Sequence, residues 1–370
     1  MRVVMISKAL VVGAYQRKAE EIARRPGVEL TVVVPPHWDE ETRRVYLERA
    51  YTAGYELLVE PIALSGRFHL HFYPRLHRLL ARRRPDVVHA DEEPYNVATM
   101  QMIGLGRRVG ARTLFFSWQN IYRRYPLPFR TIERYNLARA DCAVAGNADA
   151  ADVLRRKGFR KPIAVIPQFG IDPDLFRRPE GWTRPAGAPF TIGYVGRLVE
   201  QKGILHLLRA AAGLAGDWRL SLLGSGPLEE EARRTAAALG IGDRVQIRPS
   251  VPSTAVASHL CGLDVLVLPS LTRPNWKEQF GRVLVEAMAC EVPVVGSDSG
   301  EIPRVIGDAG LVYPEGDDLA LRERLALLLG SPEERRRLGL RGRERALARF
   351  THARIAEEYV AVYREAAKCG

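Results

Sequence analysis

The sequence lacks long apolar runs. No stretch of 18 or more consecutive apolar residues occurs among its 370 residues, so no segment is apolar enough to span a bilayer as a helix. The apolar stretch at residues 2–7 is predicted to be a first strand rather than a signal peptide, because no cleavage pattern follows it. We therefore expect a cytoplasmic protein.

Cysteine is scarce and scattered. Cys142, Cys261, Cys290 and Cys369 show no C-x-x-C spacing, which argues against a structural zinc site and against a disulfide framework. We expect reduced thiols, some of them buried as small apolar residues.

Acidic residues are scarce in the first half only. Residues 1–170 contain 28 Lys and Arg against 17 Asp and Glu, whereas residues 171–370 contain 27 against 26. A basic surplus confined to one half suggests an anionic partner for that half, such as a membrane surface, a phosphorylated acceptor or nucleic acid. A general preference for arginine over lysine would give the same composition, and the sequence leaves both explanations open.

What is present is an alternation of short apolar strands and amphipathic helices. The Pro- and Gly-rich residues 168–190 interrupt it, and it then resumes. The alternation is typical of an α/β fold with parallel sheets covered on both faces. We predict two Rossmann-like, doubly wound domains facing across a cleft, at residues 1–170 and 171–348. A C-terminal helix, 349–370, is predicted to cross back to the first domain.

Two turns in the second half follow predicted strands, where open α/β sheets bind ligands. Gly196 permits a tight turn, and Arg197 and Lys202 stand on that turn and near the start of the next helix, which suits a diphosphate. Solvated cations beside a helix start would give the same pattern. Gly224 and Gly226 form a second tight turn, which either brings backbone close to a ligand or simply joins a strand to a helix.

The stretch KEQFGRVLVEAMA, residues 277–289, carries two glutamates eight positions apart. A helix beginning near Gly281 directs unpaired N–H groups toward its N-terminal side, where they would stabilise a diphosphate. Glu278 before the helix and Glu286 within it could accept hydrogen bonds from the hydroxyl pairs of a sugar and a ribose. The alternative is a helix-terminal charge plus one solvated glutamate.

These motifs resemble the retaining glycosyltransferases of family 4, which have the GT-B fold. The resemblance covers the second half closely and the domain plan throughout, and it includes the family's E-x7-E signature. The matching stretches are GRLVEQKG (196–203), GSGP (224–227), LVLPS (266–270), residues 278–317 and the interdomain element VIPQFGIDPDLF (165–176).

The resemblance implies a nucleotide-sugar donor bound mostly by the second half. Arg197 and Lys202 would hold the diphosphate and stabilise the leaving group, Glu278 would contact the hydroxyls of the donor sugar, and Glu286 would contact the ribose. Such enzymes need no metal, because basic side chains and a helix N-terminus replace it. The other donor-binding positions that it implies are turn glycines and one stretch of backbone: Gly13, Gly196, Gly224, Gly226, Phe280 and Gly281.

The sequence departs from the family pattern at four positions. The first-half loop has one glycine, Gly13, where family members often have two, and Gln119 stands where many have a histidine. A neutral glutamine can hydrogen-bond a sugar hydroxyl or a diphosphate but cannot act as a base, so these two departures affect acceptor chemistry. Glu291 replaces a common glycine and Arg304 a frequent glutamate.

Acceptor-side candidates follow the strand predicted near residue 89. His89, Asp91, Glu92 and Glu93 cluster there, and with Gln119 they are expected where an acceptor enters. One of the two glutamates would orient an acceptor hydroxyl. His89 at the end of an apolar strand is also compatible with a hydrogen-bonded core histidine.

Residues 65–84 contain six arginines and no acid, interleaved with Phe, Tyr and Leu. This pattern suits a membrane interface, and membrane association through the acceptor domain is common in the family. An amphipathic helix packed on the sheet has the same pattern. Residues 120–130 form a second basic and aromatic stretch. The membrane interpretation predicts a peripheral position on the inner face of the membrane.

We interpret the chain as a retaining, metal-independent hexosyltransferase. It would move a hexose from a nucleotide diphosphate sugar to a hydroxyl acceptor, which is a lipid-linked glycan, a polysaccharide or a small molecule. The D-x-D of Asp172 and Asp174 lies in the linker and is expected to be structural. No nucleic-acid partner is expected, because no recognised motif for one appears. The alternatives are a non-catalytic nucleotide-sugar-binding protein and another GT-B enzyme, such as a sugar-nucleotide epimerase.

Overall fold

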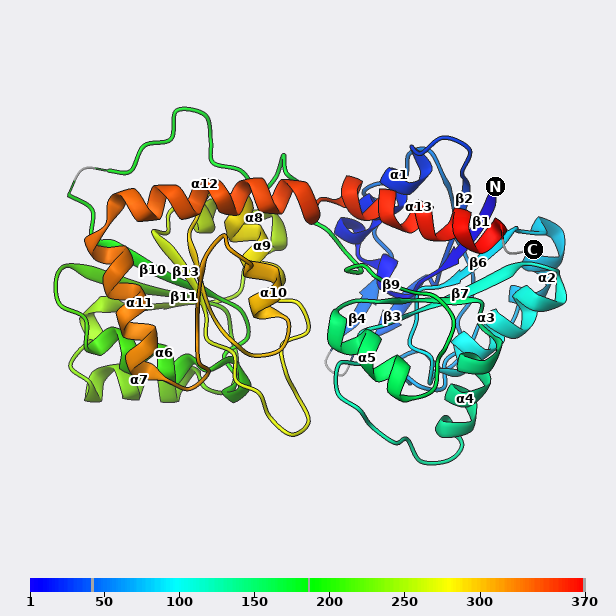
Figure 1. Ribbon diagram of the computed structural model, residues 1–370, viewed down its shortest axis with the longest axis horizontal. Coiled ribbons are helices and arrows are strands. Elements are labelled where there is room, and N and C mark those ends of the chain that lie inside the picture. Colours follow the sequence, from blue (N-terminus) through cyan, green and yellow to red (C-terminus); the bar gives the residue numbers. More distant parts are fainter. Residues whose placement is uncertain (41–42, 186, 369–370) are drawn as a thin grey trace. The chain divides into compact units, whose positions relative to one another are not determined.

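The computed structural model describes residues 1–40, 43–185 and 187–368, so Cys369 lies outside the described range. The chain divides into two compact units (Figure 1). Unit 1 comprises residues 1–170 and the C-terminal residues from 352, and unit 2 comprises residues 171–351. Each unit contains a parallel sheet with helices, so the predicted α/β class with two Rossmann-like domains is confirmed.

The sheet of unit 1 has the described strand order β5-β2-β1-β6-β7-β8-β9, and each neighbouring pair is parallel. Central strands such as β6 and β8 are buried at every residue, because both faces of the sheet are covered. The edge strand β5 and a short antiparallel pair, β3 with β4, were missed in the sequence. The strands are β1 (Arg2–Ile6), β2 (Glu29–Val34), β3 (His37–Asp39), β4 (Arg44–Tyr46), β5 (Glu56–Val59), β6 (Val87–Ala90), β7 (Arg112–Ser117), β8 (Cys142–Ala145) and β9 (Ile163–Val165).

Helices of unit 1 come from both ends of the chain. Its helices are α1 (Arg17–Ala23), α2 (Leu76–Arg83), α3 (Val97–Arg108), α4 (Phe129–Arg139), α5 (Ala148–Arg156) and the C-terminal α13 (His352–Lys368). In Figure 1, α13 runs beside α1, and the two helices are in contact. Tyr359 and Tyr363 of α13 are fully buried among residues of β1, β2 and β6, so the C-terminal helix is part of the core of this unit.

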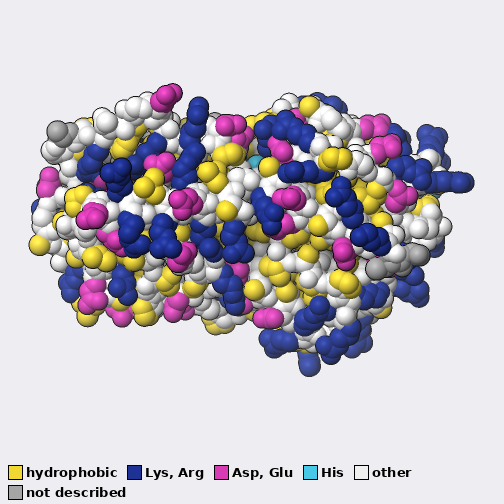
Figure 2. All heavy atoms as spheres, turned by 45° about the horizontal axis from the view of Figure 1, so that its top comes forward, with side chains coloured by type: hydrophobic (Ala, Val, Ile, Leu, Met, Phe, Trp, Pro, Cys, Tyr) yellow, Lys and Arg dark blue, Asp and Glu magenta, His cyan; other side chains and the backbone are white. Residues whose placement is uncertain are grey.

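The basic stretch 65–84 contains α2. Its Leu76, Leu79 and Leu80 are buried in the core of unit 1 together with Tyr73, so the apolar side of this helix packs against protein. Phe68 is 42% exposed. Figure 2 shows Lys and Arg side chains gathered in patches on the surface of unit 1. A membrane contact here would therefore use arginines and Phe68 rather than the leucines of α2.

Unit 2 has the described strand order β12-β11-β10-β13-β14-β15, again parallel throughout. The strands are β10 (Phe190–Val195), β11 (Trp218–Leu223), β12 (Val245–Arg248), β13 (Val265–Leu268), β14 (Val294–Ser297) and β15 (Leu311–Tyr313). The helices are α6 (Ile204–Ala212), α7 (Glu229–Ala238), α8 (Ser253–Cys261), α9 (Arg282–Ala289), α10 (Ile302–Ile306), α11 (Asp318–Gly330) and α12 (Pro332–Arg349).

Two apolar cores lie on the two faces of this sheet. One joins β10, β11 and β13 to α6, α7 and α11, and the other joins β13 and β14 to α8, α9, α10 and α12. Helices α12 and α13 make up most of the final stretch of sequence and are separated at Phe350 and Thr351. Within the described ranges, none of the helices combines the length and hydropathy that crossing a bilayer requires.

Candidate functional site

Glu278 lies in a hydrogen-bonded cluster at the carboxyl end of β13 in unit 2. Its Oε2 accepts hydrogen bonds from Lys202 Nζ at 2.5 Å and from Ser270 Oγ at 2.8 Å. Lys202 also lies over the ring of Trp276, 5.0 Å from its centroid. Glu278 is only 7% exposed, so these hydrogen bonds offset part of the cost of burying its carboxyl group. Ser270 and Trp276 were missed as site residues, although Ser270 ends the quoted motif LVLPS.

The loop that carries Glu278 is fixed through its backbone. The carbonyl of Glu278 accepts a hydrogen bond from the Glu301 amide at 3.1 Å. Gly300 has a φ of 57°, and a Cβ there would lie 2.0 Å from the Glu278 carbonyl oxygen. Glycine is therefore required at position 300 by both conformation and space, and it allows the close approach that holds Glu278 in place.

Gly281 begins the helix that follows. It adopts a left-handed conformation, with a φ of 75°, immediately before α9. The ring of Phe280 packs against Phe350, with centroids 5.7 Å apart, so the side chain of Phe280 is used in packing. This leaves the backbone at these two positions as the part that can face a ligand, as the resemblance implies.

Glu286 lies on α9 and is 8% exposed. Its Oε1 is 2.8 Å from Nε of Arg282. Burial raises the pKa of Glu286 above its usual value, and Arg282 only partly opposes this effect. A buried carboxyl group is suited to accepting hydrogen bonds from ligand hydroxyls.

The turns after β10 and β11 touch through their backbones. A Cβ at Gly224 would lie 1.8 Å from the carbonyl oxygen of Gly196, and a Cβ at Gly226 would lie 2.3 Å from that of Leu198. Close packing between the turns therefore requires these glycines. Arg197 is exposed on the first turn, and its carbonyl accepts a hydrogen bond from Tyr194 Oη at 2.7 Å.

In unit 1, the amide of Gly13 is already bound to a carboxylate. It donates to Oε2 of Glu48 at 2.7 Å. A Cβ at Gly13 would lie 2.9 Å from that oxygen, so glycine allows the contact. Glu48 was not singled out in the sequence, since no local motif links it to a residue 35 positions away.

His89 is fully buried on β6. Its Nδ1 lies 2.8 Å from Tyr363 Oη, and its ring stacks on Tyr359 at 5.3 Å. Burial lowers the pKa of His89 to about 3, so the ring is neutral at physiological pH. The structure thus gives His89 a core environment, which is the alternative that the sequence left open.

Asp91 and Glu92 are both buried beside lysines. Asp91 Oδ2 accepts a hydrogen bond from Ser7 Oγ at 2.8 Å and lies 3.5 Å from Lys18 Nζ. Glu92 forms an ion pair with Lys8. Burial alone would raise the pKa of Glu92, but Lys8 and His71 together outweigh it and hold the value at about 2. Glu92 is therefore a poor candidate for accepting a proton at neutral pH.

Glu93 and Gln119 meet at Ser117. Ser117 Oγ donates to Glu93 Oε2 at 2.8 Å and accepts from the Gln119 amide at 3.2 Å. The Trp118 amide also donates to Glu93, at 2.7 Å. Burial raises the pKa of Glu93 to about 7. Lys157 donates to Gln119 Oε1 at 2.8 Å, whereas the buried Nε2 of Gln119 has no hydrogen-bond partner in the described part of the chain.

The linker aspartates form a local turn. Asp172 Oδ1 accepts a hydrogen bond from the amide of Asp174 at 2.9 Å, which is the pattern of an Asx turn. In the described part of the chain, no group of three or more His, Cys, Asp or Glu side chains is arranged to hold a metal ion.

Two Rossmann-like units, each built on a parallel sheet, are the architecture of the GT-B fold. Residues 183–345 match the family described as "Glycosyl transferases group 1", and residues 12–168 match "Glycosyl transferase 4-like domain". The chain belongs to the glycosyl transferases group 1 family and has the GT-B fold, as the sequence resemblance predicted.

Part of this chain is similar in sequence to two curated proteins. It is 35% identical over 188 residues to alpha-maltose-1-phosphate synthase of Mycolicibacterium smegmatis, covering 47% of each chain. It is 34% identical over 226 residues to the MMP alpha-(1->4)-mannosyltransferase of Mycolicibacterium hassiacum, covering 60% of this chain and 53% of the relative. The chain therefore spans about half the length of the curated relatives it matches.

One solved structure covers the whole fold. Anabaena Alr3699/HepE, determined in complex with UDP, superposes with a TM-score of 0.74 and covers 99% of this chain and 100% of its own, at 16% identity. At this identity the likeness concerns the fold alone.

Proposed function

We propose that this protein is a retaining, metal-independent hexosyltransferase that uses a nucleotide diphosphate sugar and a hydroxyl acceptor. The observation that carries the proposal is the Lys202–Glu278–Ser270 cluster at the carboxyl end of β13, directly before the helix that bears Glu286. The names of the relatives, a synthase and a mannosyltransferase, and the UDP bound by the structural neighbour support this class of donor.

The donor residues divide into two roles. Glu278 accepts hydrogen bonds from the hydroxyls of the transferred sugar, and Glu286 accepts them from the ribose. Lys202, Arg197 and the amide groups at the start of α9 stabilise the negative charge that develops on the leaving diphosphate. Lys202 already neutralises Glu278, so a donor phosphate near it would share this cation with the carboxylate.

Unit 1 contributes the acceptor residues. Glu93, with its pKa near 7, is present in both protonation states at neutral pH and can accept or donate a hydrogen bond to an acceptor hydroxyl. Gln119 offers the unpaired Nε2 as a donor. In a retaining front-face reaction the leaving phosphate can take the acceptor proton, so this scheme does not require a separate base.

The experiment that tests the proposal combines binding with turnover. The purified protein is screened by thermal shift against nucleotide diphosphate sugars, since a ligand bound to the folded state raises the melting temperature. The stabilising sugar is then incubated with candidate acceptors, with and without EDTA, and the anomeric configuration of the product is read by NMR. We expect transfer with retention that EDTA leaves unchanged.

The variant Glu278→Gln is compared with the parent protein in both assays, because it preserves the size of the side chain and removes its charge. Donor stabilisation without transfer to any acceptor would favour the non-catalytic binding protein. Conversion of the nucleotide sugar in the absence of an acceptor would favour an epimerase. An inverted product, or loss of transfer in EDTA, would contradict the retaining or the metal-independent part of the proposal.

A further inference from the structure

Residues 218–222 of β11 and all of β12 in unit 2 alternate between apolar and polar side chains. Leu220 and Leu222 of β11 are buried in one core, and Val245 and Ile247 of β12 pack against the same core. The side chains between them are polar: Arg219, Ser221, Gln246 and Arg248. One face of this half of the sheet is therefore polar, although parallel sheets are normally covered by apolar packing on both faces.

Apolar side chains cover this face of the sheet only as far as β10. Among the described residues, the second core of unit 2 contains none from β11 or β12. Leu263, which follows α8, packs directly on the backbone of β10, because a Cβ at Gly193 would lie 2.1 Å from it. Beyond Leu263 the face forms a hollow of about 650 Å³ between α8 and the turn at residues 242–244.

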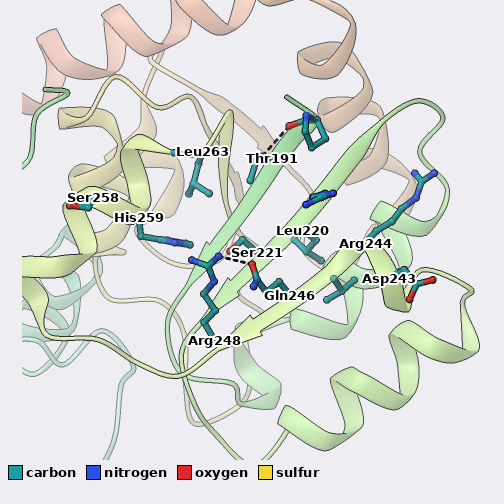
Figure 3. A pocket seen from close by; sticks show the side chains of 14 residues that line it. Thr191, Leu220, Ser221, Asp243, Arg244, Gln246, Arg248, Ser258, His259 and Leu263 are labelled. Carbon is teal, nitrogen blue, oxygen red and sulfur yellow. Dashed lines mark hydrogen bonds between the residues drawn. The ribbon is translucent and has the colours of Figure 1, made fainter. Parts of the chain in front are cut away.

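Two cationic ends border this hollow. Arg219 and Arg244 line one end. Leu220 of β11 and Val245 of β12 are register partners, and each arginine directly precedes one of them in the sequence. Arg248 and His259 line the other end, where Figure 3 shows the guanidinium of Arg248 beside the imidazole.

The two ends are separated by the length of β12. Four residues of extended strand place the Cα atoms of positions 244 and 248 about 13 Å apart. The residues that line the hollow include one acidic residue, Asp243, and three arginines, so the charged side chains there are mainly positive.

Polar groups lie between the two ends. Ser221 and Gln246 are register partners on β11 and β12, and Figure 3 shows both side chains in the hollow. Arg248 donates to Gln246 Oε1 at 2.7 Å. The buried Nε2 of His259 has no hydrogen-bond partner among the described residues. The hollow thus combines hydroxyl and amide groups at its centre with positive charge at both ends.

We propose that this hollow is a binding site for a sugar-sized molecule that carries two separated phosphoryl groups. Arginine forms strong, charge-assisted hydrogen bonds with phosphate, and the hydroxyl and amide groups suit sugar hydroxyls. The volume lies within the range of small-molecule sites. A concave shape walled by α8 favours a small molecule over a flat macromolecular surface.

The site is distinct from the donor site proposed above. None of its lining residues belongs to the donor set, and the hollow extends to Pro189 and Arg244 at the amino ends of β10 and β12. Donor residues instead follow the carboxyl ends of the strands. The two sites are adjacent through one contact, because the Gly224 amide donates to the carbonyl of Arg248 at 2.9 Å.

Isothermal titration calorimetry with fructose 1,6-bisphosphate tests the proposal on the full chain. The titration is performed with and without saturating UDP, and is repeated with fructose 6-phosphate and with inorganic phosphate. We expect saturable binding of the bisphosphate that UDP does not abolish. It should be at least about tenfold tighter than that of the monophosphate, because the second phosphoryl group adds charge-assisted hydrogen bonds.

Single variants test the two ends separately. Arg219→Gln and Arg248→Gln should each weaken bisphosphate binding about tenfold or more, and monophosphate binding should fall in one variant more than in the other. The matched control is Arg234→Gln, an exposed arginine on α7, which should leave the affinity unchanged. Thermal melting confirms that each variant is folded.

Three results would overturn the proposal. They are the absence of saturable bisphosphate binding, displacement of the bisphosphate by UDP, and equal weakening in the Arg234→Gln control. Because the readout is binding in the presence of UDP, the result does not depend on whether the protein transfers sugar.

Discussion

Nζ of Lys202 lies 2.5 Å from Oε2 of Glu278, although the two residues are 76 positions apart in the sequence. Lys202 belongs to the segment after β10, and Glu278 to the loop after β13. These strands are parallel neighbours in the sheet, so both side chains lie beyond the carboxyl ends of the strands, on the same side of the sheet. The ion pair is partly buried, with side chains that are 21% and 9% exposed, and each charge therefore depends on the other.

Removing either member of this pair should affect stability and activity differently. Lys202→Met and Glu278→Gln should each lower transfer activity by about 100-fold or more, since each removes an interaction with the donor in the transition state. Lys202→Met should also lower the melting temperature, because the buried carboxyl group of Glu278 loses its ion pair with Lys202. The double variant should regain much of that loss without regaining activity. Thermal melting and initial rates measure the two effects, and full activity in Glu278→Gln would contradict the donor assignment.

Ser270→Ala tests whether the orientation of Glu278 matters for transfer. Loss of the 2.8 Å hydrogen bond should lower kcat by about tenfold, a cost of roughly 1–1.5 kcal/mol that is typical of one hydrogen bond. The matched control is Ser297→Ala, because Ser297 Oγ donates to the Ser270 carbonyl at 2.5 Å and not to Glu278. That control should lower stability with little change in kcat. Equal effects on kcat would indicate a packing role for Ser270.

Glu93 should make stability depend on pH. Its folded pKa of about 7 lies above the unfolded value of about 4.3, so the folded state binds more protons between these values. The free energy of unfolding should then fall as pH rises from about 4.3 to 7, by up to about 1.4 kcal/mol per pH unit from this group. Glu93→Gln should remove this contribution. Urea unfolding of both proteins from pH 4.5 to 8 measures it, and parallel pH profiles would show that the carboxyl is not titrating there.

The exposed arginines around α2 test membrane binding. We expect that replacing Arg75, Arg78 and Arg82 by glutamine lowers affinity for vesicles containing anionic lipid by about 100-fold, since each basic residue near the surface contributes about 1 kcal/mol. Co-sedimentation with anionic and neutral vesicles measures this. The matched control replaces Arg233 and Arg234 of α7, which lie in unit 2. Equal binding by the triple variant and the parent would contradict a membrane role for residues 65–84.

Much of the fold follows from local patterns. Alternating apolar strands and amphipathic helices predicted the parallel sheets, because burial on both faces demands continuous apolar strands such as β8 and β13. The edge strand β5 was missed, since a strand with one exposed side carries a weaker apolar signal.

The candidate site was only partly predictable. The E-x7-E spacing places Glu278 and Glu286 around one helix start, and that spacing is local. Glu48 at the Gly13 amide could not be found in this way, because its contact joins residues 35 positions apart. For His89 the sequence left both an acceptor-side role and a core role open. The structure gives it a core environment, where Tyr363 of the C-terminal helix, 274 positions away, hydrogen-bonds it.

Local sequence patterns are enough to predict the fold class, the family and the helix start that lies between the two glutamates, because periodicity and motif spacing act over short distances. Tertiary structure decided which polar groups are paired and buried. Burial raises the pKa of Glu93 and a lysine lowers that of its neighbour Glu92, although the two are adjacent glutamates. Desolvation and ion pairing depend on which side chains surround a group, and the folded chain sets those surroundings.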